Sequence, residues 1–157
     1  MAIVKFYRGD PNAPKPTMGA RLGANAIITC KGKILLEKRR DSDVWGLIGG
    51  GVKNYETEVQ AMAREVREEL GLRVHPSRFT RLKSYGEPGR VAAYCDGSVW
   101  RMVIVVFALE LEEEPPLVVS SESTALRFFS KEELKDIEVV VTHADIVEEL
   151  FVNRQDS

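Results

Sequence analysis

The sequence predicts a mixed α/β fold in which helices pack on a β-sheet. Runs of β-branched and apolar residues recur at strand length, and residues 57–71 combine a helical apolar period with start and stop signals for a helix. These strand-like and helix-like segments alternate loosely, which is typical of helices that cover a sheet. A chain of 157 residues can bury a substantial core, so we expect one domain over residues 1–157.

Strands are predicted on both sides of this helix. Residues 1–19 are expected to form a short edge strand at 3–7 and a proline-rich extended connector. The Lys31-Gly32 pair indicates a tight hairpin between two strands. The strands are expected at residues 24–29, 33–37, 45–48, 81–85, 99–109 and 125–129. Residues 86–97 are predicted as a loop, Ser130 with Glu133 as the start of a short helix, and Thr142 as the cap of a last helix.

The central helix has clear boundaries. Thr57 and Gln60 have the spacing of a capping box, and Gly71 occupies the position where a helix often ends. Three faces follow from the helical period. They are a core face with Val59, Ala63, Val66 and Leu70, a basic face with Arg64 and Arg67, and an acidic face with Glu58, Glu65, Glu68 and Glu69.

The acidic face is the most informative feature of the chain. Glu65, Glu68 and Glu69 are spaced i, i+3 and i+4, so they project from one side. Like charges at this spacing destabilise a helix by ~0.2–0.5 kcal/mol per pair, which suggests that a cation offsets them. Carboxylates suit Mg²⁺ or Mn²⁺, which prefer oxygen ligands. The glycines at residues 49–51 are expected to form a flexible turn that lets the backbone approach a ligand.

These residues belong to a longer motif that resembles the box of the Nudix hydrolases. The specified positions of that box are filled by Gly50, Glu56, Arg64, Glu65, Val66, Glu68, Glu69, Gly71 and Leu72. The motif covers residues 50–72 and lies on a predicted turn, helix and turn, so it is far more specific than a short glycine pattern. The resemblance implies a mixed β-sheet sandwiched between α-helices, and hydrolysis of a nucleoside diphosphate linked to another group.

The resemblance also implies roles for individual residues. Glu65 and Glu69 would be the principal ligands of Mg²⁺ (or Mn²⁺), with Glu68 and the Gly49 carbonyl as further ligands. Arg64 would orient the carboxylates, and Glu56 would be a carboxylate behind the ligands. The general base is open between Glu65 in the box and Glu122 in a later loop. The catalytic candidates are therefore Glu65, Glu68, Glu122 and Arg64.

A second group of residues are candidates for substrate binding. Arg39 and Arg40 precede the glycines and are candidates for phosphate contacts, with a solvated loop as the equal alternative. Gly50 and Gly51 are candidates for close backbone approach to phosphate. Trp45 is a candidate for stacking on a base, although a core position is favoured. Tyr55 and Tyr94 are weaker candidates for contact with a base or ribose, because surface or rim packing is favoured for each.

Composition restricts the class of partner. The net charge of −2, from 22 basic and 24 acidic residues, argues against a large nucleic-acid surface. Among the substrates that the family resemblance implies, a small nucleotide is therefore expected. The two cysteines lack metal-ligand spacing, and neither a signal peptide nor a membrane-length apolar run is visible, so a cytoplasmic location is expected. A homodimer through the N-terminal segment is a further expectation.

Two alternatives to this enzyme stay open. One is a Nudix module that senses a nucleotide without cutting it, although such a module would be expected to lack box carboxylates and this chain keeps them all. The other is a pyrophosphohydrolase of RNA 5′ ends, which would need a basic, aromatic-lined groove. Among small nucleotides, ADP-ribose-like compounds, sugar nucleotides and nucleoside triphosphates are not separated by the box.

Overall fold

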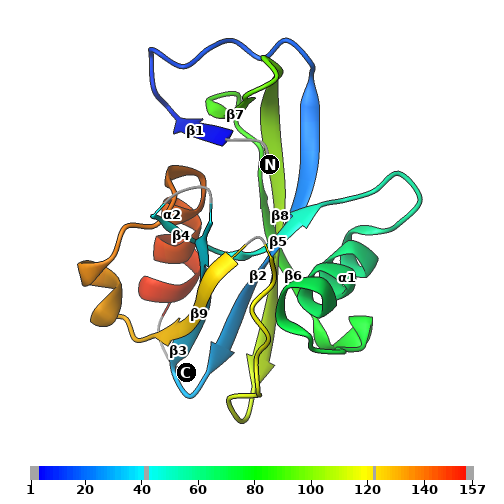
Figure 1. The fold of residues 1–157 in the computed structure, drawn as a ribbon, viewed down its shortest axis with the longest axis vertical. Coiled ribbons are helices and arrows are strands. Elements are labelled where there is room, and N and C mark those ends of the chain that lie inside the picture. The colour runs from blue at the N-terminus through cyan, green and yellow to red at the C-terminus, as the bar shows by residue number, and fades with distance from the viewer. Residues whose placement is uncertain (1–3, 41–42, 122, 155–157) are drawn as a thin grey trace.

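The computed structural model describes residues 4–40, 43–121 and 123–154, within which nine strands form one mixed sheet (Figure 1). The strands are β1 (Val4–Arg8), β2 (Ala20–Cys30), β3 (Lys33–Arg39), β4 (Trp45–Gly46), β5 (Ile48–Gly51), β6 (Thr80–Tyr85), β7 (Arg90–Tyr94), β8 (Val99–Leu111) and β9 (Ser123–Phe129). The helical elements are α1 (Glu58–Leu70), η1 (Pro76–Arg78), η2 (Glu133–Asp136), α2 (Val141–Val147) and η3 (Glu148–Val152). No helix in these residues is long and apolar enough to cross a membrane.

The sheet is built around the parallel pair β2 and β8. Their register runs from Ala20 opposite Arg101 to Cys30 opposite Leu111, and the other strand pairs are antiparallel. The main order is β1-β7-β8-β2-β3-β4, with β5 added to β2, β6 to β8 and β9 to β3. Because β2 is antiparallel to β5 and parallel to β8, the sheet is mixed, as the sequence predicts.

Helices cover both faces of the sheet (Figure 1). On one face, Met62, Val66 and Leu70 of α1 pack with alternate β2 residues such as Ile28. On the other face, the residues that pack with Ile27 of β2 are Ile146, Val147 and Phe151 from α2 and η3. The α/β/α sandwich expected from the sequence is therefore confirmed.

The predicted ends of α1 are confirmed. The Thr57 amide donates to Gln60 Oε1 at 2.9 Å and the Gln60 amide donates to Thr57 Oγ1 at 3.2 Å, which completes the capping box. Gly71 ends the helix with a φ of 73°, a conformation that favours glycine. The core face is broader than predicted, because Ala61 and Met62 are buried together with Val66 and Leu70, whereas Val59 and Ala63 are only partly buried.

The predicted flexible turn at residues 49–51 is wrong, because these glycines belong to β5. Gly49, Gly50 and Gly51 pair with Asn25, Ala24 and Gly23 of β2. Three glycines have little preference for a strand, so only the neighbouring strand and the hydrogen bonds that it supplies fix this conformation.

Two further predictions need correction. The predicted loop at residues 86–97 contains β7, which lies between β1 and β8 and is fixed by both neighbours. Thr142 does not cap the last helix; it is fully buried within α2, which follows Val140. By contrast, the predicted box at Ser130 is confirmed, since the Glu133 amide donates to Ser130 Oγ at 3.1 Å and the Ser130 amide donates to Glu133 Oε1 at 2.9 Å.

Candidate active site

Strand β5 brings its glycines against the backbone of β2. Gly49 has a φ of 151°, and a Cβ there would lie 2.1 Å from the carbonyl oxygen of Ala24. Asn25 stabilises the same segment, because its Nδ2 donates to the carbonyls of Leu47 and Ile48, each at 3.4 Å. Glycine is therefore required at position 49 to seat the start of the box.

The carboxylates of α1 lie directly on this strand. The Gly49 amide donates to Glu69 Oε2 at 3.0 Å, which accounts for the burial of Glu69 in a helix whose other acids are more exposed. A Cβ at Gly50 would lie 2.6 Å from Glu65 Oε1, so the Glu65 carboxylate occupies the space that a side chain at position 50 would need. The glycine strand and the helix thus form one rigid unit.

Arg64 connects the carboxylates of the box. Its Nε and Nη2 donate to both oxygens of Glu56, at 3.0 and 2.6 Å, and its Nη1 donates to Glu65 Oε1 at 2.8 Å and to Glu68 Oε2 at 3.1 Å. Nη2 also donates to the Gly51 carbonyl at 2.9 Å. The expectation of a separate basic face is wrong for Arg64, because its long side chain reaches across to the acidic face.

This arrangement leaves an excess of negative charge. Glu56, Glu65 and Glu68 share one guanidinium, so three carboxylates face a single positive charge. The hydrogen bonds from Arg64, with a further one from the Lys53 amide, lower the pKa of Glu56 to about 2. Hydrogen bonding to Glu56 and Glu65 raises the pKa of Arg64 above its ordinary value despite its burial. Both groups are therefore charged at neutral pH, and the ion pairs around Arg64 join three carboxylates to one guanidinium.

The donor chemistry of this unit fits a divalent cation. Oxygen ligands and excess negative charge are what Mg²⁺ or Mn²⁺ requires. Within the described ranges, however, no three histidine, cysteine or acidic side chains converge closely enough to hold one ion. Arg64 and the Gly49 amide account for this, since they hold the carboxylates of Glu65, Glu68 and Glu69.

The other sequence candidates have different partners. Arg40 donates to the carbonyls of Ser121, at 2.8 Å, and Ser123, at 3.3 Å, and the Arg39 guanidinium lies 5.2 Å from the ring centre of Phe6. The Trp45 ring packs edge-on against Phe129 at 4.8 Å, in the cluster beneath α2. Glu122 lies outside the described residues. The structure thus brings together the box residues and gives Arg39, Arg40 and Trp45 contacts elsewhere.

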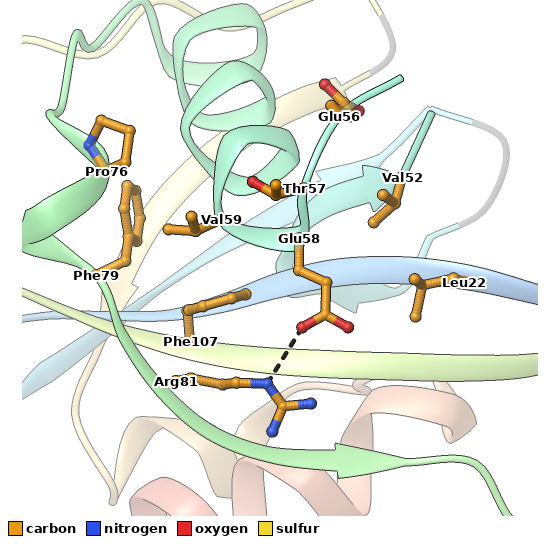
Figure 2. Close-up of a pocket in the computed structure, with 10 residues that line it drawn as sticks. All are labelled: Leu22, Val52, Glu56, Thr57, Glu58, Val59, Pro76, Phe79, Arg81 and Phe107. Carbon is orange, nitrogen blue, oxygen red and sulfur yellow. Dashed lines mark hydrogen bonds and ion pairs between the residues drawn. The ribbon is translucent and has the colours of Figure 1, made fainter. Parts of the chain in front are cut away.

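Two hollows lie beside the segment from Val52 to Glu56. The first has a volume of about 690 Å³ and is lined mainly by apolar residues (Figure 2). In its lining, Glu58 Oε1 lies 3.2 Å from Arg81 Nε. The second, of about 860 Å³, shares Val52 and Glu56 with the first. Of the two, the second is also lined by Gly51, Arg64 and Glu65, so it is the hollow that meets the Glu65 carboxylate.

The second hollow also contains residues that the sequence did not single out. Arg21 and Trp100 line it together with Tyr94. Arg21 and Trp100 lie far apart in the chain, and their proximity depends on the parallel pairing of β2 with β8. A local pattern offers no signal for such a contact.

Comparisons with known proteins agree with this geometry. The Nudix domain model matches residues 19–150. The chain is 33% identical over 107 residues to the CTP pyrophosphohydrolase of Escherichia coli (strain K12), and this aligned region covers 66% of this chain and 77% of that protein. A match to the RNA pyrophosphohydrolase of Pseudomonas syringae pv. syringae has 35% identity over 66 residues, or 42% of this chain and 38% of that protein.

A solved structure shares the fold over most of the chain. The crystal structure of a MutT Nudix hydrolase from Burkholderia pseudomallei superposes with a TM-score of 0.65 and 29% identity, over 83% of this chain and 96% of that chain. Since the family model spans most of the sequence and the fold agrees, the protein belongs to the MutT-like Nudix hydrolases and is a pyrophosphohydrolase that acts on nucleotides.

Proposed function

We propose that the protein hydrolyses the pyrophosphate bond of a small nucleotide in a metal-dependent reaction, by attack of water on phosphorus. The observation that carries this proposal is the unit of Glu56, Arg64, Glu65 and Glu68, which has excess negative charge and opens into a hollow of about 860 Å³. A hollow of this size suits a small-molecule ligand. The carboxylates suit a divalent cation that would accompany the phosphates.

Glu65, Glu68, Glu69 and the Gly49 carbonyl are the proposed ligands of Mg²⁺ or Mn²⁺. When bound, the metal would polarise a phosphoryl oxygen and lower the pKa of a coordinated water. Glu65 is also our candidate for the group that accepts the proton of the attacking water, with Glu122 as the alternative. Arg64 would act as a positioning residue, because it fixes the carboxylates of Glu65 and Glu68 at once.

A nucleoside triphosphate is the favoured substrate. The similarity to the CTP pyrophosphohydrolase extends over 107 residues and therefore well beyond the box, whereas the match to the RNA pyrophosphohydrolase covers 66. The net charge of −2 also argues against a long polyanion. ADP-ribose-like compounds and sugar nucleotides remain in the panel to be tested, because loops outside the box decide substrate choice in a shared fold.

The test is an activity screen with Mg²⁺ and Mn²⁺ over nucleoside triphosphates, ADP-ribose, sugar nucleotides and triphosphorylated RNA. We expect phosphate or pyrophosphate release from a triphosphate, and none in the presence of EDTA. Glu65→Gln should lower kcat at least about 100-fold without unfolding the protein. Glu58→Gln is the matched control, because Glu58 lies on the same helix but pairs with Arg81. Near-native turnover in Glu65→Gln would remove its proposed role.

A second variant tests the packing of β5 on α1. Gly50→Ala places a methyl group where the Glu65 carboxylate lies, and this side chain must move. We expect kcat to fall while the folded state persists, since the obstructed group is the end of a side chain. If the whole panel stays silent while metal still binds, the protein is a nucleotide sensor and not an enzyme.

A further inference from the structure

The hollow beside the box has an aromatic end. The guanidinium of Arg21 lies 5.0 Å from the ring centre of Tyr94 and 4.9 Å from that of Trp100. Both rings are half-buried and Arg21 is exposed. Cation–π contacts of this kind hold an arginine in place while its N–H groups remain available. Within the part of the chain that the structure describes, Arg21 makes no hydrogen bond or ion pair. An acidic group within its influence is Asp96, whose pKa is lowered by hydrogen bonds from Ser98 and, to a lesser degree, by the charge of Arg21.

The strand register explains why this group lies at the box. Strand β5 pairs with β2 only as far as Gly23, and the Val52 amide then donates to the Leu22 carbonyl at 3.0 Å. Arg21 lies beyond this last backbone contact on that side of β2. Trp100 stands on β8 opposite Ala92 of β7, and Tyr94 ends β7 with its amide bonded to the Ser98 carbonyl. The hollow therefore forms where β5 stops, between the start of β2 and the chain that leads into α1.

The lining of the hollow is chemically divided. Gly51, Arg64 and Glu65 belong to the box, whereas Tyr94 and Trp100 offer ring surfaces. We propose that Arg21, Tyr94 and Trp100 form the subsite for the base of the nucleotide, so that the phosphates lie toward the carboxylates. This proposal rests on the proposed function and specifies which end of the substrate the hollow recognises. Bases stack on aromatic side chains and on guanidinium planes.

The donors of Arg21 also select among bases. A guanidinium offers only donors, in a planar fork that matches two adjacent acceptors. Guanine presents two such acceptors in O6 and N7, and cytosine presents O2 and N3, whereas adenine places an amino group beside N7. The subsite therefore prefers cytosine or guanine nucleotides to adenine nucleotides.

Steady-state kinetics test this selection. We expect kcat/KM for CTP or GTP to exceed that for ATP by about tenfold or more, which is the discrimination that one bidentate contact supplies. Arg21→Lys keeps the charge but lacks the fork, so the preference should largely disappear through KM while kcat is retained. Equal kcat/KM values for all bases in the native protein, or an unchanged preference in Arg21→Lys, would overturn the assignment.

The aromatic contact has its own variants. Trp100→Ala should raise KM for every base about tenfold, since stacking does not depend on base identity. Trp100→Phe should bring KM most of the way back to the native value, because phenylalanine keeps a ring on which the base can stack. Thermal unfolding of each variant establishes that the fold persists. An unchanged KM in a folded Trp100→Ala protein would show that the base binds elsewhere.

Tryptophan fluorescence provides a readout that needs no turnover. The chain has two tryptophans, and Trp45 packs against Phe129 beneath α2. We expect CMP to quench the emission of the native protein and of Trp45→Phe, but not that of Trp100→Phe. Quenching that disappears in Trp45→Phe instead would overturn the proposal. This binding test remains valid for an inactive protein, so a failure of the proposed hydrolysis and a failure of the subsite can be distinguished.

Discussion

Two arginines organise the two faces of the sheet in contrasting ways. Arg64, on the face covered by α1, is bonded to three carboxylates and stays 14% exposed. Arg90 of β7 is fully buried, and it donates to Asp145 of α2 at 3.1 and 2.6 Å. It also contacts Glu87, the Thr142 carbonyl and the Tyr85 ring.

The difference between the two clusters is their charge balance. Asp145 also faces Arg8 of β1 at 3.6 Å, so two arginines are matched by Asp145 and Glu87. Around Arg64, three carboxylates face one cation. This cluster joins β1, β7 and α2 around the buried Arg90, and its ion pairs match two arginines with two carboxylates. The ratio of carboxylates to guanidinium groups, and not the presence of an arginine, is what distinguishes the proposed metal site from the Arg90 cluster.

The largest effect should come from breaking the balanced cluster. Arg90→Ala leaves Asp145 without its bidentate partner, and the loss of one member of a buried pair costs about 3–5 kcal/mol of unfolding free energy. Urea denaturation measures this loss. The double variant Arg90→Met with Asp145→Leu should recover most of it, because apolar groups of similar size replace the buried charges. A loss below about 1 kcal/mol in Arg90→Ala would contradict a structural role for the cluster.

We expect a divalent metal to stabilise the folded protein through the carboxylates around Arg64 and not through those around Arg90. A metal at 100 times its dissociation constant stabilises the native state by about 2.7 kcal/mol, so Mn²⁺ should raise the Tm. Glu68→Gln removes one of the excess charges and should reduce this increase. Glu87→Gln, at the Arg90 cluster, is the matched control and should leave the increase unchanged. An equal reduction in both variants would show that metal does not distinguish the two clusters.

Acid should weaken the α2 face before the α1 face. His143 accepts a hydrogen bond from the Leu47 amide at 3.1 Å, and burial, with the charges of Arg39 and Arg90, lowers its pKa to about 3. Unfolded histidine takes up its proton near pH 6.5, so the unfolded state binds more protons between these values. Stability is therefore complete above pH 6.5 and falls toward pH 3, by about 2 kcal/mol at pH 5. Glu56, with its pKa near 2, contributes a loss only below about pH 4.5.

His143→Asn isolates this contribution, because asparagine keeps an acceptor for the Leu47 amide but does not titrate. Its unfolding free energy should vary less between pH 6.5 and pH 5 than that of the native protein. Parallel profiles for the two proteins in urea titrations would assign the acid sensitivity to other groups.

The smallest expected effect compares the two capping boxes. Thr57→Ala removes the cap of the thirteen-residue α1 and should cost about 1 kcal/mol. Ser130→Ala removes the same bond from the short η2, where fewer residues depend on it, and should cost less. Thermal unfolding of both variants ranks them, and the reverse order would mean that η2 supports the α2 face more than its length indicates.

Local signals in the sequence predicted the parts of the fold that local interactions fix. The capping pair of Thr57 and Gln60, the Gly71 terminus and the hairpin at Lys31-Gly32 all act within a few residues. The helix spacing also indicated that Glu65, Glu68 and Glu69 lie together, and their roles as ligands stay predictions.

The parts that sequence reasoning missed depend on distant partners. Strand β7 is short and flanked by turn residues, and only β1 and β8 make it a strand. Nothing near Arg90 indicates that it is buried, because Asp145 reaches it through the packing of α2. Likewise, Arg21 and Trp100 meet only through the pairing of β2 with β8.

The parallel pairing of β2 with β8 also determines when the protein can fold during translation. An isolated helix of thirteen residues is only marginally stable in water, so α1 needs a surface on which to dock. Val105, Phe107 and Leu109 of β8 supply part of that surface, yet they follow α1 in the chain. A nascent chain that ends before β8 therefore has the complete box motif without the part of the docking surface that β8 supplies. The ribosome must release most of the polypeptide before the first turnover becomes possible.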